Sequence, residues 1–231
     1  MKISGVIKTS LIDYPGFLTT TIFTQGCNFK CPYCHNPELI PEESENEEYM
    51  ELNYFWKFLQ DRNELIDAVT ITGGEPTLQA DIVEFISGIK ARGFKVKLDT
   101  NGSNPKVVKN LLTNKLIDYI ALDIKSSLEN YNWFSEDEAT ADRVRETIKI
   151  IKNADIEHEF RTTVVPGLHD KKEMKKIGNL VDEDDKYVVQ NFKPAKTYNN
   201  KYENKKRFSD ERLQEFANVI EDKCKLIQIK N

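Results

Sequence analysis

The sequence predicts an α/β fold, a partial (β/α)6 TIM-like barrel built on a mainly parallel sheet. The first observation is that strand-like and helix-like patterns alternate about six times, at intervals of roughly 25 to 35 residues, which is the spacing of βαβ units. The second is the length of 231 residues, since a full eight-unit barrel takes about 250. Right-handed crossovers would curl such a sheet, so we expect one open barrel domain over residues 1–231.

The predicted strands are short runs rich in β-branched and aromatic residues. They cover residues 3–8, 18–23, 68–72, 94–98, 117–122, 156–165, 187–192 and 226–229. The predicted helices have apolar residues at helical spacing, such as Leu52, Phe55 and Leu59. They cover residues 50–61, 78–92, 106–114, 139–153, 171–180 and 210–223. Residues 126–138 are expected to form a long polar loop.

Composition limits the classes of partner. The chain has 33 basic and 38 acidic residues and a net charge of −5, whereas a general nucleic-acid binder usually has a basic face and a high pI. No stretch approaches the roughly 18 consecutive apolar residues of a membrane helix. Residues 1–8 lack the apolar region of a signal peptide. We therefore expect a soluble, cytoplasmic protein with reduced thiols and no nucleic-acid or membrane partner.

Three of the four cysteines lie within eight residues, in the pattern C-x-x-x-C-x-x-C formed by Cys27, Cys31 and Cys34. Gly, Asn and Pro surround them without the apolar periodicity of a core segment, so they are interpreted as metal ligands. A zinc site needs four ligands, and the nearby fourth candidate is His35. A [4Fe-4S] cluster offers four irons to thiolates, so three cysteines would leave one iron open for reaction. An internal disulfide would leave one of the three thiols over. The remote Cys224 is interpreted as a buried or incidental thiol, because as a fourth ligand it would close that position.

The cysteine loop, with Tyr33 before its last cysteine, resembles the signature of the radical S-adenosylmethionine (SAM) enzymes. Residues 10–16, 23–27 and 33–37 resemble more narrowly the glycyl-radical-enzyme activases, most of all the anaerobic ribonucleoside-triphosphate reductase activating proteins. The resemblance runs from about Ser10 to about Pro166. It implies a single radical SAM domain whose cluster loop is residues 25–37.

The resemblance also implies cofactors, partners and a reaction. Cys27, Cys31 and Cys34 would hold a [4Fe-4S] cluster that binds SAM at its open iron. An external one-electron donor such as flavodoxin or ferredoxin would drive cleavage of SAM to a 5'-deoxyadenosyl radical. That radical would take a hydrogen atom from a glycine of a glycyl-radical enzyme, here an anaerobic ribonucleotide reductase. Such chemistry requires anaerobic conditions.

The segment Gly73-Gly74-Glu75-Pro76 follows a predicted strand, at the end of the sheet where α/β proteins gather functional groups. Its two glycines allow the backbone to approach a ligand closely, and the carboxylate can receive an ammonium group. The resemblance assigns this motif to the methionine amine of SAM. Alone, the motif is a turn with Glu75 as an exposed acid at a helix N-terminus.

Residues 99–102 and 123–125 end the next two predicted strands. Their carboxylates and hydroxyls suit ribose hydroxyls or a hard cation. The candidate cofactor-binding residues are Asp99, Thr100, Asn101, Asp123 and Lys125. The resemblance further implies a monovalent-cation site at Asp99, Thr100 and Asp123. The alternatives are a plain turn at residues 101–102 and a surface salt bridge between Asp123 and Lys125.

Arg161 lies on the predicted strand 156–165, where an inward guanidinium needs an anion or a carbonyl as partner. By strand alternation, Thr163 and Val165 share its face. The resemblance brings residues 161–167 near SAM, with Arg161 and Val165 as contacts. A structural ion pair is the alternative for Arg161.

The sequence departs from the activases at two positions and leaves two rival functions open. Activases often have a basic residue where this chain has Phe17 and Leu18, and residues 190–193 contain no counterpart of a histidine found on the adenine side in pyruvate formate-lyase activases. The rivals are a radical SAM enzyme acting on a small molecule, such as a 7-carboxy-7-deazaguanine synthase, and a noncatalytic metal-binding module. No acid/base pair or nucleophilic triad is evident.

Overall fold

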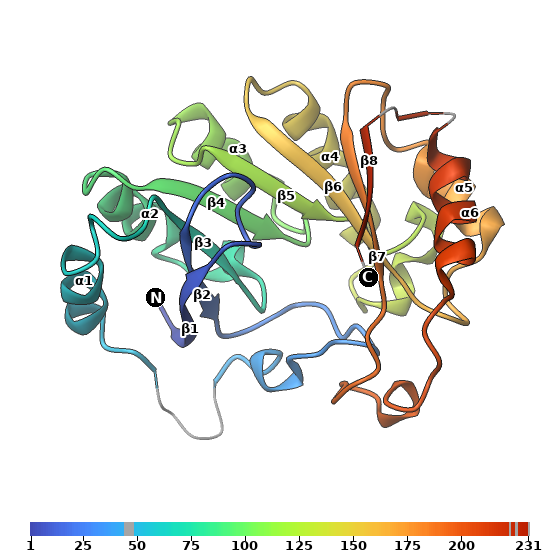
Figure 1. Ribbon diagram of the computed structural model, residues 1–231, viewed down its shortest axis with the longest axis horizontal. Helices are drawn as coiled ribbons and strands as arrows, with labels where there is room; N and C mark the ends of the chain where they lie inside the picture. Colours follow the sequence, from blue (N-terminus) through green and yellow to red (C-terminus); the bar gives the residue numbers. More distant parts are fainter. Residues whose placement is uncertain (44–48, 222, 225, 231) are drawn as a thin grey trace. The chain divides into compact units, whose positions relative to one another are not determined.

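The computed structural model describes residues 1–43, 49–221, 223–224 and 226–230. Within these residues the strands are β1 (Ile3–Ser10), β2 (Thr19–Thr24), β3 (Ala68–Gly73), β4 (Lys95–Thr100), β5 (Tyr119–Asp123), β6 (Glu157–Val164), β7 (Lys186–Asn191) and β8 (Leu226–Lys230). The α-helices are α1 (Leu52–Gln60), α2 (Ile82–Lys90), α3 (Pro105–Thr113), α4 (Thr140–Lys152), α5 (Lys171–Gly178) and α6 (Asp210–Glu221). Strands and helices alternate along the chain (Figure 1).

The sheet topology confirms the predicted α/β class. The strands follow one another in chain order, β1 to β8, in one sheet. β2 pairs with β3, β3 with β4, β6 with β7 and β7 with β8 in parallel, whereas β1 is antiparallel to β2. Each strand from β2 to β7 is followed by one α-helix, which gives the six strand–helix units that the sequence predicts.

The chain divides into two compact units, each discontinuous in sequence. Unit 1 consists of residues 1–28, 38–100 and 106–120, and unit 2 of residues 29–37, 101–105 and 121–231. The boundary falls inside the cysteine loop, after Asn28. The prediction of one domain over residues 1–231 remains a prediction.

Unit 1 is built around buried residues of β2, β3 and β4 and the helices that follow them. Phe55 of α1 stacks on Phe85 of α2 with ring centroids 5.2 Å apart, and both rings are buried. Gly73 ends β3 with φ +125°, and a Cβ there would lie 2.1 Å from the Thr24 backbone nitrogen. Only glycine permits this approach between the ends of β2 and β3.

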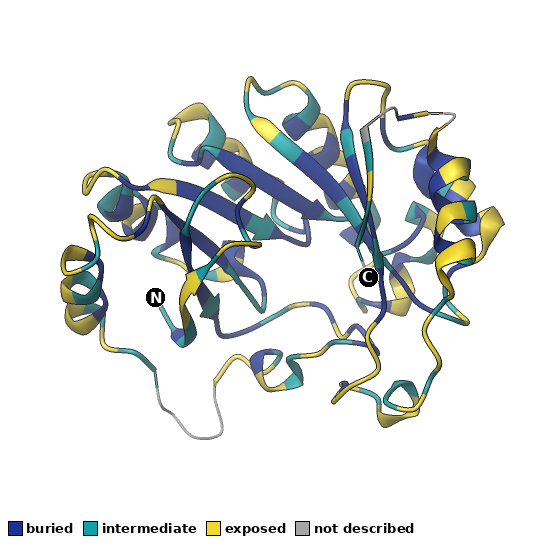
Figure 2. Ribbon diagram, viewed as in Figure 1, coloured by how far each residue is buried: buried dark blue, intermediate teal, exposed yellow. Residues whose placement is uncertain are grey.

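Unit 2 packs α5 and α6 with β7 and β8. Leu213 and Phe216 of α6, Ile177 of α5 and Val188 of β7 are fully buried. Figure 2 shows both helices with one dark, buried face and one exposed face, as their helical spacing predicts. None of the helices in the described residues is both long and apolar enough to span a membrane.

Two details differ from the sequence prediction. α2 begins at Ile82, because residues 76–78 form a separate 3-10 turn, η2 (Pro76–Leu78), capped by Glu75. Residues 126–138 are not simply a polar loop, since they contain the 3-10 helix η3 (Leu128–Trp133). Tyr131 and Phe134 are 2% and 1% exposed. Their rings pack against Phe29 and Tyr33 of the cysteine loop, at centroid distances of 6.2 Å for each pair, which accounts for their burial.

Candidate functional site

The first part of the cysteine loop belongs to unit 1 and is fixed by its backbone. Gly26 has φ +90°, and its N–H donates to the Leu39 carbonyl at 2.9 Å. The Cys27 N–H donates to the Ile40 carbonyl at 3.0 Å. The buried Gln25 side chain donates to the carbonyls of Glu38 and Pro41 at 2.9 and 2.8 Å. Cys27 is therefore presented from an ordered turn directly after β2.

The second part of the loop belongs to unit 2. The Cys34 N–H donates to the Cys31 carbonyl at 3.0 Å, which closes a turn around Tyr33. Tyr33 is 5% exposed, and its hydroxyl has no hydrogen-bond partner among the described residues. Burial raises the pKa of Tyr33 well above its usual range. A buried, unsatisfied hydroxyl is costly and usually marks a place where a partner is expected.

The four cysteines form no disulfide. In the described part of the chain, no three His, Cys, Asp or Glu side chains are grouped as for a single metal ion. A [4Fe-4S] cluster makes a different demand, because each thiolate binds its own iron. The donor set of three thiols in one loop fits that demand.

Cys224 and His35, the two alternative fourth ligands, both make other contacts in the structure. The thiol of Cys224 is fully buried and donates to the Asp185 carbonyl at 2.6 Å. This agrees with the interpretation of Cys224 as a buried thiol. The His35 ring stacks on Phe192 at a centroid distance of 5.7 Å and an interplanar angle of 16°, and it hydrogen-bonds to the backbone of Lys196.

Glu75 is directed into unit 1 and is 1% exposed. Its Oε1 accepts hydrogen bonds from the Thr77 N–H at 3.1 Å, the Thr77 hydroxyl at 2.5 Å and the Thr100 hydroxyl at 2.7 Å. The alternative of an exposed acid at a helix N-terminus is therefore wrong as to exposure, although Glu75 does cap η2. The structure brings together Glu75 and Thr100, two of the predicted site residues.

Asp99, at the end of β4, pairs with Lys97 two residues earlier on the same strand face. Lys97 is 2% exposed, and its ammonium lies 5.8 Å from the centroid of the Tyr119 ring. A buried ammonium is stable only beside such a partner. The sequence did not identify Lys97; the signal was a lysine between the buried Val96 and Leu98, two residues before an acid.

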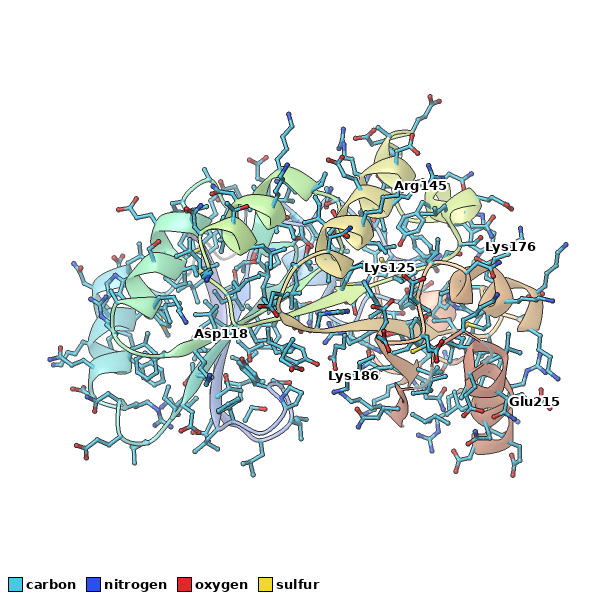
Figure 3. The ribbon with its side chains drawn as sticks, turned by 90° about the horizontal axis from the view of Figure 1, so that it is seen from above. Asp118, Lys125, Arg145, Lys176, Lys186 and Glu215 are labelled. Atoms are coloured by element: carbon cyan, nitrogen blue, oxygen red, sulfur yellow. The ribbon has the colours of Figure 1, made fainter. Side chains whose placement is uncertain are left out.

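Asp123, Lys125 and Arg161 form a half-buried cluster in unit 2; Lys125 is labelled in Figure 3. An oxygen of Asp123 lies 2.8 Å from Arg161 Nε, and the other lies 3.1 Å from Lys125 Nζ. Burial by itself would raise the pKa of Asp123, but Arg161 and Lys125 outweigh it and hold this pKa well below its usual range. The predicted ion pairs at Arg161 and at Lys125 are both present, and neither is a surface pair. These three side chains carry a net charge of +1, and the buried Glu159 carboxylate also lies 3.7 Å from the Arg161 guanidinium.

Lys125 is also coupled to the cysteine loop within unit 2. Burial lowers the pKa of Lys125, but Asp123, Cys31 and Tyr33 together raise it well above its usual range. The Lys125 ammonium therefore stays charged and interacts electrostatically with Cys31. Several predicted residues of unit 2 thus influence one another electrostatically. They are Cys31, Tyr33, Asp123, Lys125 and Arg161.

Asn101 shapes the turn after β4. Its side-chain oxygen accepts the Ser103 N–H at 2.9 Å, and Gly102 follows with φ +78°. A Cβ on Gly102 would lie 2.6 Å from a methyl carbon of Leu122. The predicted plain turn at residues 101–102 is present.

His169 is a residue of this region that sequence analysis did not identify. It is 4% exposed, and its Nδ1 accepts the Val165 N–H at 3.0 Å. Because Nδ1 accepts, the neutral ring carries its proton on Nε2, which lies 3.0 Å from the Lys125 carbonyl. His169 thus links two predicted site residues, Val165 and Lys125. The only signal in the sequence was a histidine four residues after Val165 in a Pro-Gly turn.

The predicted monovalent-cation ligands do not offer an open set of oxygens. Asp99 is paired with Lys97, Asp123 with Lys125 and Arg161, and the Thr100 hydroxyl donates its hydrogen to Glu75. A cation at either carboxylate would compete with these ammonium and guanidinium groups. These paired side chains therefore do not fit a monovalent cation, and the proposed function does not require one.

Comparison with known proteins places this geometry in a family. The model of the radical SAM superfamily matches residues 21–179. A Methanocaldococcus jannaschii protein named as a glycyl-radical enzyme activating enzyme is 35% identical over 222 residues, covering 94% of this chain and 90% of its own length. The pyruvate formate-lyase-activating enzyme of Clostridium pasteurianum is 28% identical over 187 residues, covering 78% of this chain and 76% of its own length.

Two solved structures share the fold. Streptococcus suis SuiB bound to its precursor peptide SuiA has a TM-score of 0.67 at 18% identity over 91% of this chain, which spans 48% of the SuiB chain. A domain of pyruvate-formate lyase-activating enzyme from Bacteroides vulgatus has a TM-score of 0.54 at 17% identity, covering 71% of this chain and 99% of that domain. The family model over residues 21–179 and the 35% identical M. jannaschii relative show that the chain belongs to the radical SAM superfamily, among the glycyl-radical enzyme activating enzymes.

Proposed function

We propose that this protein cleaves SAM reductively and uses the resulting radical to install a glycyl radical on a partner enzyme. The observation that carries the proposal is the loop of Cys27, Cys31 and Cys34 directly after β2, since three thiolates leave one iron of a [4Fe-4S] cluster open. The similarity to an activating enzyme over 94% of the chain supports the same function. The family model runs from residue 21 to 179, which supports one radical SAM domain.

The cofactors divide the work with the protein. When bound, the cluster supplies the electron that splits SAM into methionine and a 5'-deoxyadenosyl radical, which takes a hydrogen atom from a glycine Cα of the partner. Cys27, Cys31 and Cys34 would hold the cluster. The protein's own contribution is to bind, orient and shield the reacting groups.

The strand-end residues suit the two charged ends of an amino acid. The carboxylate of Glu75, held by the two threonine hydroxyls, would receive the ammonium group of SAM, with Gly73 and Gly74 allowing close approach. Lys125 and Arg161, which together exceed the charge of Asp123, would receive the SAM carboxylate. Tyr33, Asn101 and Val165 would line the remaining contacts. Asp99 would hold the Lys97 ammonium in place, and the Thr100 hydroxyl would orient the Glu75 carboxylate.

Partner, donor and location form the finer part of the proposal. The resemblance of residues 10–16, 23–27 and 33–37 to the anaerobic ribonucleoside-triphosphate reductase activating proteins favours such a reductase as partner. The 28% identical pyruvate formate-lyase-activating enzyme makes a lyase-type partner the second to be tested. The electron would come from a flavodoxin or a ferredoxin. We place the protein in the cytoplasm, where thiols that bind iron remain reduced.

The first experiment tests SAM cleavage. Anaerobically reconstituted protein, given a low-potential reductant, is expected to form 5'-deoxyadenosine and methionine in equal amounts. Cys31→Ala should reduce this to background, whereas Cys224→Ala should retain it, because Cys224 lies in the core on the Asp185 carbonyl. One equivalent of zinc with no SAM cleavage would instead identify a noncatalytic metal module.

The second experiment tests the radical acceptor. Reconstituted protein, SAM and reductant are mixed with an anaerobic ribonucleotide reductase or with a pyruvate formate-lyase, and each mixture is examined by electron paramagnetic resonance. A glycyl doublet with one of them identifies the partner. SAM cleavage without a doublet from any glycyl-radical enzyme would favour a small-molecule substrate.

A further inference from the structure

Residues 193–207, which we name the basic segment, have a charge opposite to that of the chain as a whole. They contain six basic residues, Lys193, Lys196, Lys201, Lys205, Lys206 and Arg207, and one acidic residue, Glu203. The whole chain has a net charge of −5. Such a concentration of one sign creates a local potential that attracts an oppositely charged partner.

Backbone hydrogen bonds fasten the basic segment to the cysteine loop, within unit 2. The Tyr198 N–H donates to the Cys34 carbonyl at 3.0 Å, and the Asn199 N–H donates to the Pro32 carbonyl at 2.9 Å. Phe192, just before the segment, stacks on His35. The basic segment therefore lies directly beside Cys34, a proposed cluster ligand, and beside Pro32, which follows the proposed ligand Cys31.

The positive charges of the segment face solvent. Lys193, Lys201 and Lys206 are exposed and have no ion-pair partner among the described residues. Three other lysines of unit 2 differ from these, since Lys152, Lys176 and Lys186 each pair with a carboxylate. Tyr198 is 48% exposed, so the segment also presents an aromatic ring to solvent. Aromatic residues ringed by charge are typical of protein interfaces.

The location favours one kind of occupant. The proposed reaction needs one electron from outside for each SAM cleaved, and the donor must approach the cysteine loop to deliver it. Redox partners form small, transient interfaces whose association is steered by complementary charge. An acidic donor protein therefore matches both the charge of the basic segment and its position on the loop.

We propose that the basic segment is the docking surface for an acidic protein that carries a flavin or an iron–sulfur group and donates one electron to the cluster. One electron leaves the reduced donor and one electron is gained by the cluster, with no proton or group transferred. This inference rests on the proposed function, because it presumes a cluster at Cys27, Cys31 and Cys34.

The test compares two triple variants that change net charge equally. The first is Lys193→Glu, Lys201→Glu and Lys206→Glu, in the basic segment. The control is Lys149→Glu, Lys172→Glu and Lys175→Glu, at exposed positions of α4 and α5 in the same unit. The donor probe is a reduced acidic flavodoxin, and the comparison reductant is photoreduced 5-deazariboflavin, a small molecule that needs no docking surface.

Binding and rate are both measured with reconstituted protein at low ionic strength. We expect the first triple variant to weaken flavodoxin binding, and to slow flavodoxin-driven reduction of the cluster, by about tenfold or more, and to flatten the salt dependence of both. SAM cleavage with photoreduced deazaflavin should equal that of the wild type. The control triple variant should retain most of the wild-type binding and rate.

Four results are decisive. Unchanged flavodoxin binding in the first triple variant, or an equal loss in the control, overturns the inference. Normal donor-driven SAM cleavage with loss of the glycyl radical on the partner also overturns it, since the segment would then dock the radical acceptor. Absence of SAM cleavage by the wild type with either reductant overturns the proposed function, while the binding measurement still tests the surface.

Discussion

Glu75 in unit 1 lies just after β3 and Asp123 in unit 2 is the last residue of β5, but different kinds of group hold them. Glu75 accepts its hydrogen bonds from an amide and two hydroxyls, which are neutral donors. Asp123 is held by an ammonium and a guanidinium. Neutral donors orient a carboxylate and leave its charge in place, whereas two cations reverse the charge of the site.

The difference teaches that the position of a carboxylate at a strand end does not determine which ligand it suits. The Glu75 site favours a cationic group, and the Asp123 site favours an anionic group. Changing the charge at each site tests this difference, and the largest effect is expected where two cations hold the carboxylate.

The largest effect is expected for Asp123→Asn. The amide preserves the shape of the side chain but leaves the mostly buried Lys125 without its paired carboxylate, and leaves Arg161 with the Glu159 carboxylate 3.7 Å away. Breaking such a group should lower the free energy of unfolding by about 3 kcal/mol, measured by urea unfolding. The control is Asp142→Asn, since Asp142 is 76% exposed and pairs with Arg145; it should change stability by about 0.5 kcal/mol or less. A loss of less than about 1 kcal/mol at Asp123 would remove the distinction between the two sites.

Lys97→Met tests whether an internal ammonium occupies the place of a monovalent cation at Asp99. The variant leaves a mostly buried carboxylate without its lysine and should lose about 2 kcal/mol of stability in choline chloride. Sodium or potassium chloride should restore part of that loss, while the wild type should behave alike in all three salts. Lys90→Met removes a half-buried pair with Asp118 and should show no preference among the cations. Equal stabilisation of the wild type by sodium would contradict the idea.

The features of the fold and the site that the sequence predicts are those set by neighbouring residues, whereas contacts between distant residues are not predicted. The strands, the helices and the cysteine loop follow from periodicity and spacing, and their order was predicted closely. The ion pairs at Asp123 were open alternatives, because Arg161 is 38 residues away. The bridge by His169 and the burial of Tyr131 depend on which loops meet after folding, and single-sequence patterns do not encode that. Lys97 was overlooked because a lysine in a strand is usually exposed.

Glu75→Gln should act on ligand binding more than on stability. The amide oxygen still accepts hydrogen bonds from Thr77 and Thr100, but the charge that would attract an ammonium is lost. We expect the affinity for SAM to fall about tenfold, the effect of one charge-assisted hydrogen bond. Equilibrium dialysis with reconstituted protein measures this.

The matched control for Glu75 is Glu173→Gln. Glu173 is also held by neutral donors, namely Ser126, the Ser127 N–H and Asn130, but it is not a predicted ligand of SAM. Its variant should keep wild-type affinity. Equal losses at both positions would mean that Glu75 serves the fold and not the ligand.

The smallest effect concerns pH and the histidine that supports Lys125. Burial lowers the pKa of His169 despite hydrogen bonds and nearby Glu173 and Asp170, which raise it. The unfolded chain binds a proton near pH 6.5, while the folded chain does so only at lower pH. Stability is therefore complete above about pH 6.5 and falls as the pH decreases below it, by about 1 kcal/mol down to pH 5.5.

His169→Gln should remove that decline while keeping a donor for the Lys125 carbonyl. The half-buried His158 provides the opposite case, because the hydrogen bond that its Nε2 donates to the Asp185 carboxylate raises the pKa of His158 despite burial. That stabilisation is present below about pH 6.5 and is lost as the pH rises through the raised pKa. His158→Gln should therefore remove a gain in stability between pH 8 and 6.5, whereas His169→Gln should flatten the decline below pH 6.5. Urea unfolding at pH 5.5, 6.5 and 8 separates the two, and parallel curves for both variants would show that neither ring is held in the protonation state inferred from its hydrogen bonds.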